Sequence, residues 1–260
     1  MKRQIVLTLL ALTALTSLAQ LLLQQTHKPV APDGYSFWTV LPDDYAMTDR
    51  PLPVIIYLHG ASICGQNLNR VKRYGTLEAI DKGLKIEAIV VAPQNPGGSW
   101  KPSKINDILE WVEHEYRVDT TRVSVVGMSL GGYGTMDFAG TYPEKIAAAM
   151  ALCGGCTLKD QLPLGDLPLW IIHGTGDRAV PVKKSQDVVA LLHNNGRDSR
   201  LRFDWMRGAS HGALARLFYL EETYQWLLSH STADDGRPVN RDVVITHAMM
   251  TQAYTRLYRR

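Results

Sequence analysis

The chain has 260 residues, of which 45% are hydrophobic and 20% are charged, with a formal net charge of +3. This length and composition suit one globular domain with a sizeable core. The small net charge, with no basic stripe or charge run, argues against a nucleic-acid partner.

The N-terminus has the pattern of an export signal. Two basic residues precede an apolar run from Ile5 to about Ala14, and Ser17-Leu18-Ala19 follows as a small-x-small cleavage site. The run is short and rich in threonine for a membrane span, although Leu21-Leu22-Leu23 could extend it into an uncleaved anchor. We therefore predict a signal peptide over 1–19, a secreted or periplasmic location, and no stable membrane span after cleavage.

Short apolar segments along the chain predict strands. After a flexible lead-in over 20–34, an edge strand is expected at Tyr35–Leu41. Continuous apolar runs of four to eight residues are typical of strands buried on both faces. Such runs occur at Val54–Leu58, Ile86–Ala92, Val123–Val126, Ala147–Leu152 and Leu169–Ile172, with a more polar one at Leu201–Trp205.

Helical patterns alternate with these strands. They cover Ser103–Tyr116, with Ser103 as the expected N-cap, and Leu130–Tyr142, Ser185–Asn194 and Glu221–Ser229. Alternating helices and fully apolar strands predict an α/β fold with a mostly parallel, doubly wound sheet over 35–230. The twelve residues Thr157–Pro168 are too few for a large cap domain.

A C-terminal extension of unknown role follows at 231–260. Its first part is polar and contains glycine and proline, which indicates a linker. Val243–Ile245 is a candidate short strand, and Ala248–Tyr258 is a candidate helix.

The segment Gly127-Met-Ser129-Leu-Gly131-Gly132 is a G-x-S-x-G motif between a predicted strand and a predicted helix. A serine in such a sharp turn has a strained backbone, and its neighbours must be almost free of side chains for the helix to pack on the strand. The serine hydroxyl then lies at a helix N-terminus, which favours developing negative charge. We predict that Ser129 is a nucleophile; the alternative is a tight turn without chemistry.

A serine nucleophile needs a base, normally a histidine that a carboxylate holds in one tautomer. Both should lie in loops at the carboxyl ends of parallel strands. Among eight histidines, His211 is predicted to be the base because it lies in a glycine-containing loop after the last strand. His59 and His173 each follow a strand and precede a glycine, so we expect them to be turn and packing residues.

The predicted carboxylate is Asp177, in the loop His173-Gly-Thr-Gly-Asp177 after a buried strand. It gives the chain order Ser–Asp–His. The alternative is an aspartate that hydrogen-bonds its own turn. Asp160, Asp166 and Asp204 are weaker candidates.

Two backbone N–H groups should stabilise the oxyanion of a tetrahedral intermediate. One is expected from Leu130, after the serine. The other is expected from the loop after His59-Gly60, at Ala61 or, as the second choice, Ser62.

The chain contains three cysteines, Cys64, Cys153 and Cys156. Export would permit disulfides, and an odd number allows at most one bridge within the chain. Without a nearby histidine pattern they make a poor zinc site, so we predict no metal and structural cysteines, with room for one bridge near the catalytic face.

Together these residues resemble the α/β-hydrolases, from about Tyr35 to Ser229. Within them the chain is similar to secreted carboxylesterases grouped with feruloyl and acetylxylan esterases, polyhydroxybutyrate depolymerases, and predicted peptidase or phospholipase/carboxylesterase proteins. The resemblance is carried by Tyr57–Ala61, Ala92-Pro93-Gln94, Val118–Val123, Gly127–Thr135, Tyr142-Pro143, Cys153-Gly154-Gly155, His173–Asp177 and Ser210-His211.

This resemblance implies ester hydrolysis through an acyl-enzyme without a metal or an organic cofactor. It also implies that Trp100 lines the substrate pocket, although on the residues alone Trp100 is equally a packing residue. The expected partner is an ester substrate such as an acetylated or feruloylated polysaccharide. The alternatives are a serine peptidase on the same fold and a non-catalytic binding protein. Oligomeric state is left open.

Overall fold

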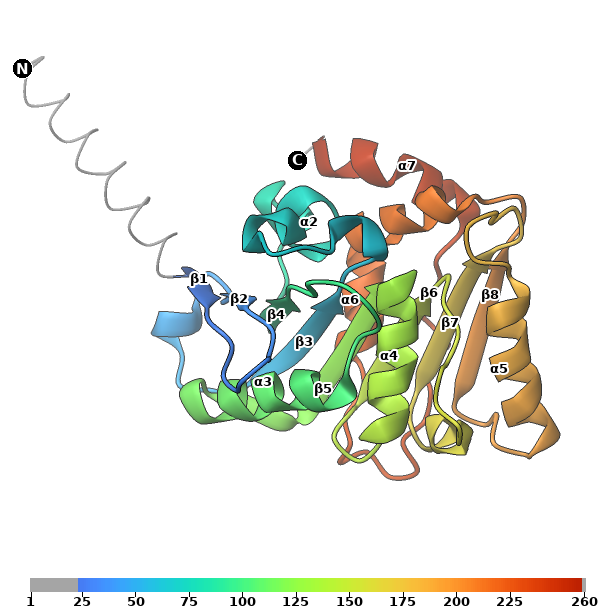
Figure 1. The fold of residues 1–260 in the computed structure, drawn as a ribbon, viewed down its shortest axis with the longest axis horizontal. Coiled ribbons are helices and arrows are strands. Elements are labelled where there is room, and N and C mark those ends of the chain that lie inside the picture. The colour runs from blue at the N-terminus through green and yellow to red at the C-terminus, as the bar shows by residue number, and fades with distance from the viewer. Residues whose placement is uncertain (1–22, 259–260) are drawn as a thin grey trace, which may run out of the picture.

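The computed structural model describes residues 23–258, so the predicted signal peptide lies outside the described residues. The described chain forms a single eight-stranded sheet in the order β1-β2-β4-β3-β5-β6-β7-β8, seen in Figure 1. Its strands are β1 (Gln24–His27), β2 (Phe37–Val40), β3 (Leu52–Leu58), β4 (Ile89–Pro93), β5 (Val118–Met128), β6 (Ala148–Leu152), β7 (Leu169–Gly174) and β8 (Leu201–Met206).

All pairings from β4 to β8 are parallel, whereas β2 pairs antiparallel with β4 and β1 antiparallel with β2. The predicted mostly parallel α/β sheet is therefore confirmed. The edge assignment was wrong, because β1 lies in the expected lead-in and covers β2. Strand β1 is polar, and His27 attaches it to β2: the His27 ring stacks on Phe37, and its Nε2 lies 2.8 Å from the Thr39 hydroxyl.

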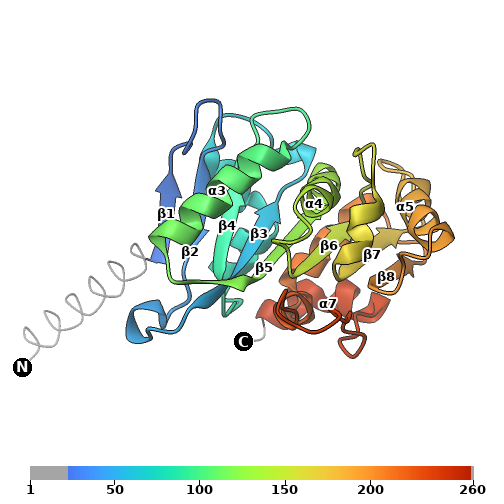
Figure 2. The same ribbon diagram turned by 90° about the horizontal axis from the view of Figure 1, so that it is seen from below.

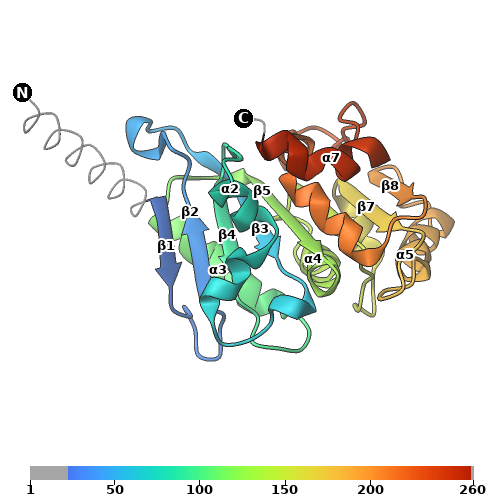
Figure 3. The ribbon, with the colours of Figure 1, turned by 90° about the horizontal axis from the view of Figure 1, so that it is seen from above.

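Helices cover both faces of the sheet, as Figures 2 and 3 show from below and above. One face is buried by α3 (Pro102–Glu115), α4 (Leu130–Thr141) and α5 (Lys183–Asn194). The other is buried by α2 (Thr76–Asp81), α6 (Glu221–Leu228) and α7 (His247–Tyr258). Strand residues alternate between the two cores; in β3, Ile55 and Tyr57 face one and Ile56 and Leu58 the other. Within residues 23–258, no helix combines the length and apolar character needed to cross a bilayer.

Two local predictions were wrong. Ser103 is not the N-cap of α3: Lys101 occupies that position and Pro102 begins the helix, which suits a residue with fixed φ and no N–H to satisfy. Val243–Ile245 does not form a strand. The predicted C-terminal helix is confirmed as α7.

The C-terminal extension is an integral part of the fold. Helix α7 packs against η5 (His211–Tyr219), a 3₁₀ segment after β8. The Tyr254 ring lies 4.7 Å from that of Tyr219, and the Arg216 guanidinium donates to the Thr251 carbonyl at 3.1 Å. The extension therefore supports the segment that begins at His211.

Candidate active site

Ser129 lies in a strained turn between β5 and α4, with φ 60° and ψ −120°. A non-glycine residue in this region is uncommon and persists only where its surroundings enforce it. The neighbouring glycines allow the close packing: a Cβ on Gly131 would lie 1.8 Å from the Leu58 carbonyl oxygen, and one on Gly127 would lie 2.4 Å from the Gly131 carbonyl oxygen. The steric expectation for this motif is confirmed.

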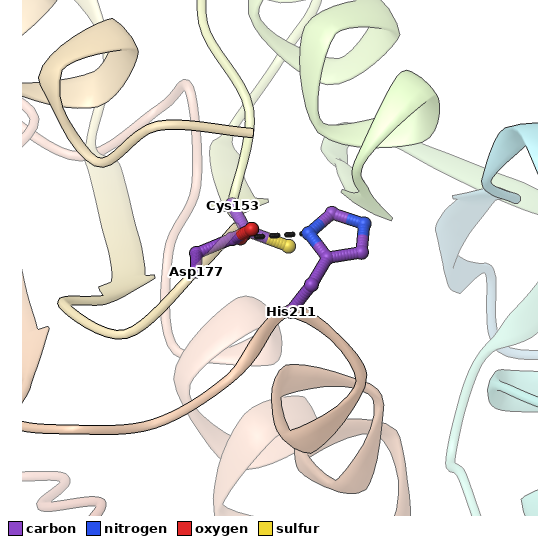
Figure 4. A group of neighbouring side chains, drawn as sticks. All are labelled: Cys153, Asp177 and His211. Atoms are coloured by element: carbon purple, nitrogen blue, oxygen red, sulfur yellow. Dashed lines mark hydrogen bonds and ion pairs between the residues drawn. The ribbon is translucent and has the colours of Figure 1, made fainter. Parts of the chain in front are cut away.

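Asp177 and His211 form a hydrogen-bonded pair. Asp177 follows β7 and His211 begins η5, and the His211 Nδ1 lies 2.7 Å from the Asp177 Oδ2 (Figure 4). The carboxylate is fully buried, whereas 24% of the His211 side chain is exposed. Because a carboxylate only accepts, Nδ1 carries the proton and Nε2 keeps its lone pair. That nitrogen is turned away from Asp177 in Figure 4, which suits a general base.

The second oxygen of Asp177 is held by its own turn. Oδ1 accepts the backbone N–H groups of Ala179 at 2.8 Å and Val180 at 2.9 Å. Burial acts to raise the pKa of Asp177, but the hydrogen bonds from His211, Val180 and Ala179 outweigh it, so the pKa lies below its ordinary value. Asp177 therefore does both things that its sequence position suggested. Its Oδ1 accepts hydrogen bonds from its own turn, and its Oδ2 accepts one from His211.

His173 touches the same carboxylate, which sequence reasoning missed. Its Nε2 lies 2.9 Å from the Val180 carbonyl oxygen and 3.3 Å from the Asp177 Oδ2, and its Nδ1 lies 2.7 Å from the Ser185 hydroxyl. Burial lowers its pKa. His173 is a turn residue, as expected, and it also fixes the position of Asp177.

Cys153 connects the serine turn to this pair. Its Sγ and ligand atoms of Asp177 and His211 lie within 4.8 Å of one another, and the Ser129 backbone N–H is close enough to act on the pKa of the thiol. Ser129, Asp177 and His211 therefore border a single sulfur at the carboxyl edge of the sheet. The three residues predicted from the sequence are brought to one place.

The same three ligand atoms could be read as a metal site, but their chemistry does not fit one. A metal needs a thiolate and a free imidazole lone pair. Burial raises the pKa of Cys153 well above its usual value, and the His211 Nδ1 proton is committed to Asp177. Cys64, Cys153 and Cys156 are all free thiols.

The two predicted oxyanion donors flank Ser129. Leu130 is the first residue of α4 and Ala61 the first of η2 (Ala61–Ile63), so neither N–H has a partner within its own helix. Gly60 brings the Ala61 loop beside the serine: a Cβ on Gly60 would lie 3.5 Å from the Ser129 Cβ. This arrangement suits two N–H groups directed at one oxygen.

His59 and Trp100 support that loop. The His59 Nδ1 donates to the Gly60 carbonyl at 2.9 Å, and its Nε2 accepts the Asn95 N–H at 3.0 Å. The Trp100 indole N–H donates to the His59 carbonyl at 3.2 Å, and only 2% of Trp100 is exposed. The structure therefore favours the packing alternative for Trp100. The open space beside His211 is instead a cavity of about 470 Å³, lined by Gly176, Arg178, Ala179, Ser210, His211 and Gly212.

We expect acid to destabilise the fold through two buried histidines. Burial lowers the pKa of His59 and of His230 from 6.5 to about 4. Because the unfolded chain takes up these protons first, stability is full above pH 6.5 and falls as the pH drops towards 4, by roughly 3 kcal/mol for each group.

Urea unfolding at pH 7.5, 6, 5 and 4.5 tests this expectation. In the His230→Gln variant the same titration should show a slope that is smaller by about one proton. Equal slopes for the variant and the unmodified chain would contradict the assignment.

Similar proteins support the fold and the family. The chain is 27% identical over 136 residues to an esterase of Mycobacterium tuberculosis, a match covering 46% of this chain and 29% of that protein. It is 27% identical over 148 residues to acetylxylan esterase A of Aspergillus ficuum (50% and 46%) and 29% identical over 168 residues to feruloyl esterase B of Neurospora crassa (56% and 52%). The chain thus spans about half or less of the lengths of these relatives.

Among solved structures, a thermostable esterase matches with a TM-score of 0.66 and 25% identity, covering 80% of this chain and 63% of that one. The S-formylglutathione hydrolase of Staphylococcus aureus matches with a TM-score of 0.60 and 18% identity, covering 79% and 98%. The fold is that of the α/β-hydrolases, without a large cap. The family model described as "Putative esterase" matches residues 32–216, and the chain belongs to this family.

Proposed function

We propose that this protein is a serine hydrolase of carboxylic esters, with Ser129, His211 and Asp177 as its catalytic triad. The observation that carries the proposal is the 2.7 Å hydrogen bond between His211 and Asp177. In the neutral ring this bond fixes the proton on Nδ1 and the lone pair on Nε2, at the edge of the sheet where Ser129 stands in its strained turn. Membership of an esterase family supports the choice of esters.

The proposed reaction begins when the Ser129 hydroxyl attacks the ester carbonyl carbon. Its proton passes to the His211 Nε2, and the carbonyl electron pair moves onto the oxygen, where Ala61 and Leu130 N–H groups stabilise it. Collapse breaks the ester C–O bond, and His211 returns the proton to the leaving alcohol. Water then repeats the sequence on the acyl-enzyme and releases the acid. The charged Asp177 stabilises the imidazolium that forms in each half-reaction.

The substrates that we propose are acyl groups, acetyl or feruloyl, carried by polysaccharides. Two of the relatives are named as acetylxylan and feruloyl esterases. The segment Thr157–Pro168 contains only the short 3₁₀ helix η4 (Leu162–Asp166). It is too short to form a large cap, which supports access for a bulky substrate. We also propose export, on the pattern of residues 1–19.

A substrate panel tests this proposal. The purified chain would be assayed with p-nitrophenyl acetate, butyrate and octanoate, acetylated xylan, methyl ferulate and peptide anilides. We expect turnover of short acyl esters and release of acetate or ferulate. Cleavage of the anilides with no ester turnover would support a serine peptidase instead. If the protein turned over none of these substrates, the remaining alternative would be a non-catalytic binding protein. Carbohydrate-binding assays would then test that alternative.

A further inference from the structure

A tyrosine hydroxyl lies next to the loop that carries the Ala61 N–H. Tyr74 connects η3 (Leu68–Arg73) to α2 and is half-buried. Its hydroxyl lies 3.2 Å from the Ser62 Oγ. The Gly60 backbone N–H and the thiols of Cys64 and Cys153 are close enough to act on its pKa. Gly60 and Cys153 thus lie next to both Tyr74 and Ser129.

Gly60 fixes how close this hydroxyl comes to the serine. A Cβ on residue 60 would lie 2.8 Å from the Tyr74 Oη and 3.5 Å from the Ser129 Cβ. The phenol oxygen and the Ser129 Cβ therefore both border the space that the missing side chain of Gly60 leaves open. An alanine here would displace the Tyr74 hydroxyl, because 2.8 Å is too short for a Cβ contact whereas 3.5 Å is an ordinary one.

The position of Tyr74 is held by its backbone. Its carbonyl accepts a hydrogen bond from the Tyr57 hydroxyl at 3.1 Å. The next residue, Gly75, has φ 91°, and a Cβ there would lie 2.1 Å from the same Tyr57 oxygen. The Gly75 N–H is bonded to the Tyr219 hydroxyl at 3.2 Å. A group held in this way is preorganised, which is what electrostatic stabilisation of a transition state requires.

Resting on the proposed function, we infer that the Tyr74 hydroxyl is a third oxyanion donor beside the Ala61 and Leu130 N–H groups. The Ser62 hydroxyl can act as the donor in its hydrogen bond with Tyr74, which leaves the phenol proton for the oxyanion. The phenol can make that donation with or without Ser62. An alkoxide oxygen has three lone pairs, and two backbone N–H groups use only two of them. The oxyanion can therefore accept a third hydrogen bond. Burial raises the pKa of Tyr74, so the phenol keeps its proton at neutral pH.

The test is Tyr74→Phe, which removes one oxygen. With p-nitrophenyl acetate we expect kcat to fall about 100-fold with little change in KM. The affinity for an alkyl trifluoromethyl ketone, which forms a tetrahedral adduct on the serine, should fall by the same factor. Tyr116→Phe is the matched control, because it removes a half-buried hydroxyl bonded to Thr39 on another part of the sheet, and its kcat should be unchanged.

Further variants separate donation from support of the loop. Ser62→Ala removes the other end of the hydrogen bond and should cost much less than Tyr74→Phe; an equal loss in both variants would overturn the inference. If Tyr74→Phe does not fold, p-aminophenylalanine at position 74 keeps the ring and a weaker donor and should give intermediate kcat. Wild-type turnover with full activity in Tyr74→Phe overturns this inference alone, whereas no wild-type turnover overturns the proposed function with it.

Discussion

Replacing Ser129 by alanine is expected to lower kcat/KM for p-nitrophenyl acetate by on the order of 10⁵-fold or more. The reason is chemical, since alanine has no atom that can form the acyl-enzyme. Stability should change little, because residue 129 keeps φ 60° in either case and the strain is the same. Steady-state kinetics and a thermal unfolding curve of each variant measure both quantities.

The control for this experiment is Ser103→Ala, an exposed serine in the first turn of α3. Its activity and melting temperature should match those of the unmodified chain. If Ser129→Ala kept more than a few per cent of the activity, the nucleophile would have to be sought elsewhere. A fluorophosphonate label followed by peptide mass spectrometry would then locate it.

The second large effect is expected from Asp177→Asn, which should lower kcat by about 10⁴-fold. To keep the turn bonded to Ala179 and Val180, the amide oxygen must take the place of Oδ1. The amide NH₂ then faces the His211 Nδ1, which must give up its proton and become an acceptor. The proton moves to Nε2, and the base is lost because the imidazole is held in the wrong tautomer.

A plot of kcat against pH should keep rising for the Asp177→Asn variant, because hydroxide must replace the lost base. The unmodified chain should instead reach a plateau. Asp166→Asn is the matched control: Asp166 is a partly exposed aspartate paired with Arg197, and its loss should leave kcat unchanged. A fall of less than about tenfold in Asp177→Asn would show that another carboxylate orients the histidine.

The parallel part of the fold was predictable from the sequence because its strands are apolar on both faces. β3, β6 and β7 are buried along their whole lengths, so each produced a continuous apolar run. The segment at β1 carries no such signal, since Gln-Gln-Thr-His has neither an apolar run nor alternation. It is a strand through tertiary contacts with Phe37 and Thr39, which no local pattern contains.

The candidate site divides in the same way. Ser129, Asp177 and His211 could be predicted because each follows a strand and all strand ends of one direction meet at one edge of the sheet. Tyr74 could not be assigned a place at the site, and the contacts of Cys153 with Asp177 and His211 could not be predicted, because they depend on how the segment before α2 and the loop after β6 pack. The contact of His173 with Asp177 could not be predicted for the same reason. The sequence placed His173 at the end of a strand but did not show that its ring reaches the Asp177 carboxylate.

The packing of α7 on the segment that begins at His211 has a consequence for how the molecule is made. Every strand of the sheet precedes α7 in the chain, so a growing polypeptide can complete its sheet while the buttress of the histidine segment is still missing. The segment that begins at His211 is then the last part of the described fold to gain its packing partner. For the same reason, a protease cut between α6 and α7 is expected to loosen the His211 segment first, because α7 is the helix that packs against it.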